Sequence, residues 1–295
     1  MHHMAVHHIH IRLRQLTPLL AMLNDFGFTT VTHGTSEAWI RTPNAYLRLS
    51  QSDTVPLPPS DFTQAGISHL CIQTPDMHQA LRILQRHGAH PLSEPINLGT
   101  GHWYLYARTP GGDIVEIEGV PYAPTEPTPW IAHVALVSCD VVRLADFYHA
   151  LTGTTRRGGH TIGPNPRFDD VLQHPAARMI PIWLVGLNVT IELWQFLSPV
   201  TRPVTPPAAY GYHALGLTVS DVAEWCARAS DAGAVVHHQS VAEALLSDPD
   251  GNMLHLTQAA VAQPALHDCS DLAIIARVNA LWRPFDAALR WESTV

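Results

Sequence analysis

Short stretches in which apolar and polar residues alternate recur along this chain, and each is followed by a segment with helical spacing. The clearest stretches cover residues 69–76, 133–140 and 214–221, and a weaker copy at residues 8–15 opens the chain. Alternation of this kind predicts half-buried strands, because successive side chains of a strand point to opposite faces. A strand followed by a helix is therefore the repeating unit.

The repeats also end alike. In the second and fourth, a turn rich in proline and glycine leads into a last strand, at residues 109–117 and 248–256. The first and third end in plainer strands, at residues 46–49 and 190–193. Four copies of one unit predict an α+β fold of four βαβββ modules.

The order of the modules suggests that the first pairs with the second and the third with the fourth. On this interpretation residues 1–122 form an N-terminal domain and residues 130–258 a C-terminal domain. The proline-rich residues 123–129 suit an extended linker. Residues 259–295 are expected to form a helical extension, kinked or broken at Pro284.

Composition narrows the classes of protein. Of 295 residues, 46% are hydrophobic and 14% charged, which is enough apolar content to fold without disulfides. The formal net charge is −8 and every basic residue is arginine, so we expect no nucleic-acid partner. No apolar run is long enough for a membrane span or signal peptide. Widely spaced Cys71, Cys139, Cys226 and Cys269 indicate buried free thiols in a cytoplasmic protein.

Histidine is abundant, at 20 residues, so only position separates a metal ligand from the background. Comparison of the modules identifies equivalent positions on the first and last strands, which in the N-terminal half are His8, Arg48, His69 and Glu116. Two imidazoles and one carboxylate form a set that leaves coordination positions open on iron(II). We therefore predict a metal site at His8, His69 and Glu116, with Fe(II) first and Mn, Ni or Zn as alternatives.

The four modules and the turns at residues 109–116 and 248–255 resemble the vicinal oxygen chelate superfamily. That group includes glyoxalases, extradiol dioxygenases, fosfomycin-modifying enzymes and bleomycin-binding proteins. The stretch of residues 105–116 looks especially like the part of extradiol dioxygenases that carries a carboxylate ligand and a tyrosine facing the substrate. The resemblance implies that Glu116 binds metal and that Tyr106 is a catalytic residue.

Two positions depart from the dioxygenase pattern. Asn97 stands where the family has a catalytic histidine, with His102 as the nearest imidazole, and Ala45 stands at a second family histidine. We expect Asn97 and His102 to contact substrate. A glyoxalase-like site would have a carboxylate at position 48, where Arg48 could instead hold an anionic substrate through its planar guanidinium.

The C-terminal half offers His133, Glu192 and His255 at the equivalent positions, with Ala214 in the remaining one and His213 one residue out of register. A slip of one residue turns a strand side chain to the opposite face unless a bulge intervenes. A second metal site at His133, Glu192, His213 and His255 stays open. The preferred interpretation is a second domain that shapes the structure or the substrate pocket.

These observations favour an enzyme that acts on a small organic substrate, by extradiol-type or related non-haem iron oxygenation. An isomerase, lyase or epimerase that consumes no oxygen is the alternative within the same fold. A non-catalytic drug-binding protein is a third possibility, with an apolar cleft lined by Trp103, Trp183 or Trp194. We further expect no membrane association and consider a homodimer.

Overall fold

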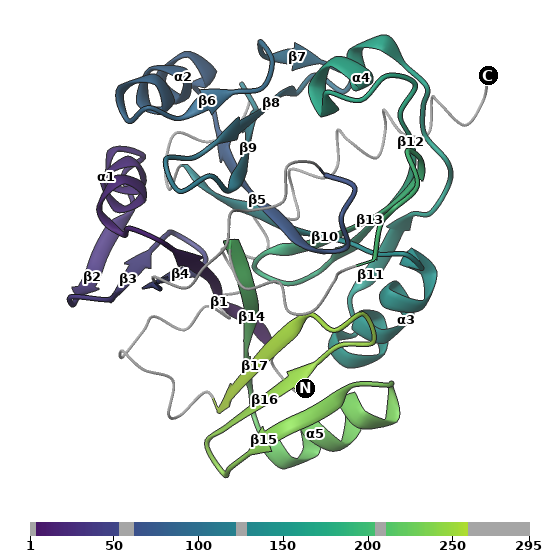
Figure 1. The fold of residues 1–295 in the computed structure, drawn as a ribbon. Helices are drawn as coiled ribbons and strands as arrows, with labels where there is room; N and C mark the ends of the chain where they lie inside the picture. The colour runs from purple at the N-terminus through teal and green to yellow at the C-terminus, as the bar shows by residue number, and fades with distance from the viewer. Residues whose placement is uncertain (1–3, 53–61, 122–128, 204–210, 259–295) are drawn as a thin grey trace.

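The computed structural model describes residues 4–52, 62–121, 129–203 and 211–258, which correspond to modules 1 to 4 in chain order. The strands of these modules form two large mixed sheets (Figure 1). We call them the outer-module sheet, built from modules 1 and 4, and the inner-module sheet, built from modules 2 and 3. The linker at residues 123–129, apart from residue 129, and the expected extension at 259–295 lie outside the described residues.

The outer-module sheet has eight strands, and the first strands of its two modules lie side by side at its centre. In order across the sheet they are β15 (Val235–Gln239), β16 (Glu243–Ser247), β17 (Met253–Gln258), β14 (Gly211–Val219), β1 (Ala5–Leu13), β4 (Tyr46–Gln51), β3 (Glu37–Arg41) and β2 (Thr29–His33).

The inner-module sheet repeats this plan, with the antiparallel pair β10 and β5 at its centre. Its strands in order are β11 (Thr155–Gly158), β12 (Arg178–Val185), β13 (Thr190–Ser198), β10 (Trp130–Val137), β5 (Gly66–Thr74), β9 (Ile114–Gly119), β8 (Trp103–Arg108) and β6 (His90–Pro91), and β7 (Ile96–Asn97) pairs with β8.

The four modules are thus confirmed, but the expected pairing of module 1 with 2 and of module 3 with 4 is wrong. Strand β1 pairs with β14, and β5 pairs with β10. Each sheet therefore draws strands from both halves of the chain. Local patterning could not reveal this, because all four modules present similar first strands and loop closure discriminates only weakly between partners.

Helices α1 (Thr17–Asp25), α2 (Met77–Arg86), α3 (Val141–Thr152) and α5 (Val222–Asp231) follow the first strands, and module 3 adds α4 (Pro166–Leu172). In three of the modules, an aspartate directly after the first strand caps the following helix. Asp76, Asp140 and Asp221 each accept a hydrogen bond from the backbone N–H three residues on. Such caps satisfy a backbone N–H that the helix leaves unpaired. They explain why helix follows strand at the same place in these modules.

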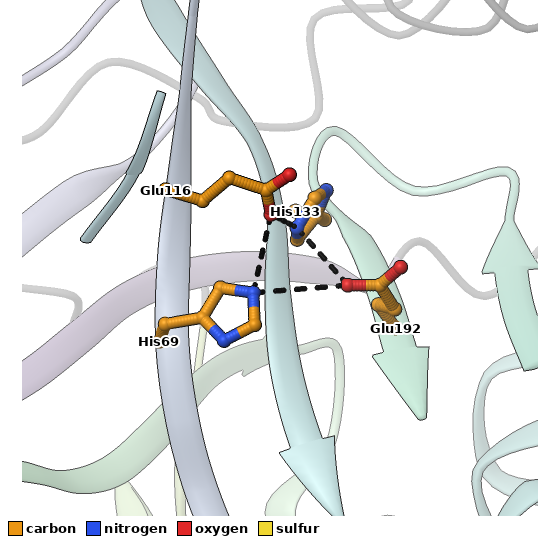
Figure 2. Close-up of side chains that lie close together, drawn as sticks. All are labelled: His69, Glu116, His133 and Glu192. Carbon is orange, nitrogen blue, oxygen red and sulfur yellow. Dashed lines mark hydrogen bonds and ion pairs between the residues drawn. The ribbon is translucent and has the colours of Figure 1, made fainter. Parts of the chain in front are cut away.

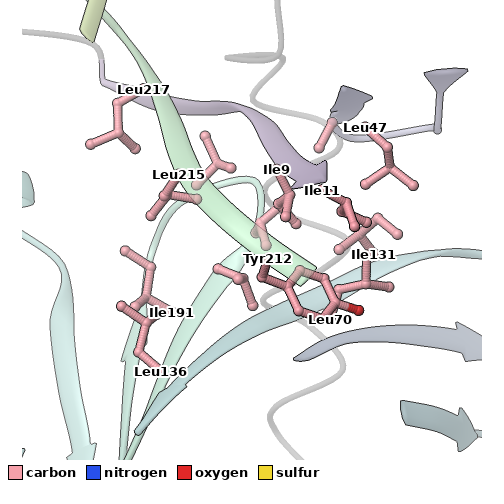
Figure 3. Packing of buried hydrophobic residues seen from close by; sticks show 14 of the residues in the cluster. Ile9, Ile11, Leu47, Leu70, Ile131, Leu136, Ile191, Tyr212, Leu215 and Leu217 are labelled. Atoms are coloured by element: carbon pink, nitrogen blue, oxygen red, sulfur yellow. The ribbon is translucent and has the colours of Figure 1, made fainter. Parts of the chain in front are cut away.

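An apolar core that draws residues from both sheets lies between them (Figure 3). Ile9 and Ile11 of β1 alternate with His8 and His10, so one face of the strand is apolar and the other carries imidazoles. Each fully buried aliphatic side chain stabilises the folded state by about 1.5–3 kcal/mol. The core residues labelled in the figure are Ile9, Ile11, Leu47, Leu70, Ile131, Leu136, Ile191, Tyr212, Leu215 and Leu217.

Hydrogen bonds also cross between the sheets. The Tyr212 hydroxyl donates to the carbonyl of Ile114 at 2.7 Å. Asn44 donates to the carbonyl of Ile131 at 2.7 Å, and Asn188 accepts from the backbone N–H of Val6 at 2.9 Å. Buried polar groups of this kind are costly unless paired, so these bonds favour one relative placement of the sheets.

Two further expectations concern the whole chain. Within the described residues no helix is both long and apolar enough to cross a membrane. Cys71 and Cys226 are buried free thiols as expected, whereas Cys139 is exposed, because it lies at the end of the first strand of module 3, just before the helix cap. Cys269 lies outside the described residues. The cytoplasmic location stays a prediction.

Candidate metal centre

Four strands of the inner-module sheet each contribute one side chain to a common point (Figure 2). His69 lies on β5 and His133 on the neighbouring β10, while Glu116 and Glu192 lie on the outer neighbours β9 and β13. Glu116 is the register partner of Cys71, two residues beyond His69, and Glu192 is the partner of Ala135, two residues beyond His133. The four side chains therefore lie on the same face of the sheet, the face away from the apolar core.

The four ligand atoms lie within 4.8 Å of one another. Glu116 Oε2 is 3.2 Å from His69 Nε2 and 2.8 Å from His133 Nε2. Glu192 Oε2 is 3.1 Å from His133 Nε2 and 3.9 Å from His69 Nε2. Two carboxylates and two imidazoles thus face each other at close range.

All four side chains are buried, and the charge on each shifts the pKa values of the others. Burial lowers the pKa of His133, but the carboxylates of Glu192 and Glu116 outweigh burial and raise it to about 9. Burial raises the pKa of Glu116, yet His133 and His69 pull it below its ordinary value. Burial raises the pKa of Glu192 to about 7 against the influence of His133. Without an additional positive charge the site must share protons among these groups.

The side chains fit a divalent metal ion. With metal–ligand distances of about 2.0–2.2 Å, neighbouring ligands of an octahedral ion lie about 3 Å apart and opposite ligands about 4 Å. The distances above span that range. Glu192 Oε2 is buried and accepts no hydrogen bond, although its other oxygen accepts from Trp183 Nε1 at 2.6 Å. A buried carboxylate oxygen that faces two imidazole nitrogens, at 3.1 and 3.9 Å, is a ligand atom that a cation would satisfy.

A cavity of about 180 Å³ opens beside the four ligands and is lined by Glu116, His133 and Glu192. Tyr106 also lines it, with its ring centroid 5.2 Å from that of His69. Burial and the Glu116 carboxylate raise the pKa of Tyr106 well above its usual range, so its hydroxyl stays protonated. The expected position of Tyr106 beside the ligands agrees with this arrangement, and its catalytic role stays a prediction.

Of the other residues expected to contact substrate, some line the cavity and some do not. His102 lines the cavity, and its Nδ1 lies in close contact with Glu118 Oε1. Asn97 does not line it, because its side-chain oxygen accepts from the backbone N–H of Gly99 at 2.7 Å and shapes a turn instead. Of the tryptophans expected in a cleft, Trp183 and Trp194 line the cavity, whereas Trp103 is exposed.

The predicted site has to be corrected at two residues, because His8 and Arg48 do not lie near the cluster. His8 lies in the outer-module sheet, where its Nδ1 is 2.9 Å from Nδ1 of His7, and it is not one of the clustered ligands. Arg48 lies in the same sheet and forms an ion pair with Glu37 at 2.8 Å, so it does not line the cavity. Both follow from the module pairing, because module 1 joins module 4.

The proposed second site is also divided by this pairing. His133 and Glu192 complete the centre with His69 and Glu116, while His213 and His255 belong to the outer-module sheet with His8. Sequence comparison had selected His133 and Glu192 as equivalents of His69 and Glu116. The signal was present, and only the choice of partner module was wrong.

Comparisons with known proteins agree with the fold. The family model described as Glyoxalase/Bleomycin resistance protein/Dioxygenase superfamily matches residues 5–117 and 130–256. Glyoxalase I from Zea mays superposes with a TM-score of 0.65 at 16% identity, covering 87% of this chain and 93% of that one. A putative dioxygenase from Bacillus subtilis gives a TM-score of 0.60 at 13% identity, covering 86% and 84%. No curated protein matches the sequence.

Proposed function

Because the chain belongs to the glyoxalase/bleomycin resistance protein/dioxygenase superfamily, we propose that it is a divalent-metal-dependent isomerase, lyase or epimerase. Its substrate is a small organic molecule with two neighbouring oxygens. The reaction transfers a proton and consumes no O₂. The site geometry favours this chemistry over the extradiol-type oxygenation that the sequence suggested first.

The observation that carries the proposal is the fourth ligand. The predicted set of two histidines and one carboxylate would leave three positions of an octahedral ion open, enough for a chelating substrate and O₂. His69, Glu116, His133 and Glu192 together leave two. Two positions accommodate two oxygens of one substrate and leave none for a separate O₂ molecule. The donor set of imidazoles and carboxylates suits iron, manganese, nickel or zinc.

When bound, the ion would act as a Lewis acid that polarises the two substrate oxygens and makes a neighbouring C–H more acidic. Glu192 is also the residue placed to take that proton: once two substrate oxygens fill the open positions, its Oε2 would give up the ion in exchange for the proton. One of its oxygens is fixed by Trp183 at 2.6 Å, and the other accepts no hydrogen bond and borders the cavity. Burial disfavours the charged form of a carboxylate, which strengthens it as a base.

Tyr106 and the aromatic wall complete the assignment. The protonated Tyr106 hydroxyl can donate a hydrogen bond to a substrate oxygen as charge develops there. The rings of Phe62, Tyr106 and Trp194 pack against one another beside His69, with centroids 4.8–6.3 Å apart, and keep water from that side of the centre. Exclusion of water strengthens electrostatic interactions within the site.

Solvent exchange tests the proposal. Protein purified without a histidine tag is reconstituted separately with each metal, and its metal content is measured. It is then incubated in D₂O with a panel of α-hydroxy ketones, α-keto aldehyde hemithioacetals and catechols. We expect deuterium incorporation beside the oxygens of one class by NMR, without oxygen uptake, and loss of incorporation in Glu192→Gln.

Other outcomes would contradict it. Oxygen uptake with a catechol would restore the dioxygenase interpretation. Tight ligand binding without turnover, and equally strong after metal removal, would indicate a binding protein instead.

A further inference from the structure

The cavity beside the metal centre has a strongly biased chemistry. Its walls are mainly apolar and aromatic, from Leu98, Phe168, Met179, Trp183 and Trp194. These side chains come from modules 2 and 3 and enclose a space suited to a flat or apolar body.

The charged groups that line the cavity are all acidic apart from histidines. Glu116, Glu118 and Glu192 contribute three carboxylates, and none of the described lining residues is an arginine. The sequence contains no lysine at all. A divalent ion at the centre would be held by two of the three carboxylates, Glu116 and Glu192, which leaves Glu118 as a further acidic group in the wall, in contact with His102.

Glu118 is held in place rather than free to turn away. It lies two residues beyond Glu116 on β9, so both point to the same face. Gln73 Nε2 donates to its Oε2 at 2.5 Å, and His102 contacts its Oε1. Gln73 is fixed in turn by Trp130, whose Nε1 donates to the Gln73 side-chain oxygen at 2.8 Å. This chain of contacts keeps a carboxylate at the cavity wall, next to the centre.

We propose that the substrate is uncharged outside its two metal-binding oxygens and carries an aromatic or apolar body. This inference rests on the proposed function for the two oxygens and adds the class of the rest of the molecule. An ionised carboxylate or phosphate on the body would meet Glu118 and find no guanidinium or ammonium among the lining residues. Selection works here by a repulsive charge as well as by apolar contact.

Matched hydroxamic acids test this directly, because each binds a metal through two adjacent oxygens. The three probes are benzohydroxamic acid, 4-carboxybenzohydroxamic acid and acetohydroxamic acid, titrated calorimetrically into Co(II)-loaded protein. We expect benzohydroxamic acid to bind most tightly. The carboxylated analogue should bind roughly thirtyfold more weakly, as expected for two like charges about 8 Å apart in a partly screened interior. Acetohydroxamic acid should bind roughly tenfold more weakly, because it lacks the ring.

Glu118→Gln identifies the cause. Glutamine can still accept from Gln73 and keeps the shape of the wall, but it removes the charge. The variant should recover roughly tenfold of the affinity for the carboxylated analogue and change that for benzohydroxamic acid less than about threefold. Glu94→Gln, at an exposed position, is the matched control and should change neither. An unchanged visible spectrum of bound Co(II) would show that the centre is intact.

The two proposals fail differently. If no hydroxamic acid binds and no Co(II) is retained, the metal-dependent function is wrong. If all three bind but the carboxylated analogue binds as tightly as benzohydroxamic acid, the metal function stands and the uncharged substrate class is overturned. Equal recovery of affinity in Glu94→Gln would remove Glu118 as the cause.

Discussion

The two sheets have the same strand arrangement but carry different residue types at matching positions. In the inner-module sheet, histidines and glutamates alternate around one point; in the outer-module sheet, the matching positions hold histidines, an arginine and an alanine. The inner set is His69, Glu116, His133 and Glu192, and the outer set is His8, Arg48, Ala214 and His255.

The difference indicates that the carboxylates, which only the inner set contains, are what make its histidines a candidate metal site. In the inner set, Glu192 and Glu116 hold the pKa of His133 above its ordinary value. In the outer set, burial lowers the pKa of His8 well below its ordinary range, and His7 and His255 lower it further. A buried imidazole such as His8, with no carboxylate facing it, is therefore held in its neutral form.

A second difference lies opposite the first-strand histidine. Ala135 is the register partner of His69, whereas Gly216 is the partner of His8. A Cβ at Gly216 would lie 2.1 Å from His8 Nδ1, so the imidazole occupies the space above the glycine. The glycine therefore leaves room for the His8 ring against the neighbouring strand β14.

The largest effect is expected from substituting the proposed metal ligands of the inner-module sheet. Glu116→Ala and His133→Ala should each lower metal affinity more than about 100-fold, because loss even of groups that support a ligand costs 10–100-fold. His8→Ala should change affinity less than about twofold. Metal content after dialysis against a graded chelator measures all three. Retention of metal by Glu116→Ala, or its loss from His8→Ala, would move the centre to the other sheet.

Gly216→Ala should have the next largest effect. The added methyl group must displace the buried His8 ring, which should lower the free energy of unfolding by up to about 3 kcal/mol. Urea unfolding measures the loss. His8→Ala in the same chain should relieve most of it, since the clash disappears with the ring. An additive double variant would show that the strain lies elsewhere.

The outer cluster should also make stability depend on pH. Burial, followed by Arg48 and His213, lowers the pKa of His10 to about 2, against 6.5 in the unfolded chain. Below pH 6.5 the unfolded state therefore binds a proton that the folded state does not, and stability falls as pH falls. Between pH 7.5 and pH 5, His10 should account for about 2 kcal/mol of this loss.

Urea unfolding at the two pH values, for the unmodified protein and for His10→Gln, isolates this contribution, because the other titrating groups cancel in the difference. Exposed His33→Gln is the control and should leave the pH dependence unchanged. If His10→Gln loses as much stability on acidification as the unmodified protein, His10 does not titrate on unfolding as described.

Much of this architecture could be predicted from the sequence, because it depends on local patterns. Alternation, the aspartate caps and the turns predict the four modules, and their alignment identifies His69, Glu116, His133 and Glu192 as equivalent residues. The partner of each module could not be predicted, since β5 and β10 are joined by backbone hydrogen bonds, which any residue can make, and every module presents a similar apolar first strand. The two predicted sites therefore contained all four clustered residues, two in each.

The position of Arg48 shows the same limit on a smaller scale. An arginine at a ligand-equivalent place predicted an anion clamp, because its guanidinium matches a carboxylate. The structure satisfies it with Glu37 from the adjacent strand β3. Short-range sequence patterns did not indicate that cross-strand partner.

Arg48→Ala should consequently have the smallest effect. The Arg48–Glu37 pair is 2.8 Å long, but the side chains are 30% and 41% exposed, and exposed pairs contribute about 0–1 kcal/mol. We expect the free energy of unfolding to fall by less than about 1 kcal/mol, with metal content and benzohydroxamic acid affinity unchanged. The stability loss should shrink further in 1 M salt, which screens exposed charges. A selective loss of binding of the carboxylated analogue in Arg48→Ala would instead make this arginine an anion clamp and join the two sheets in one site.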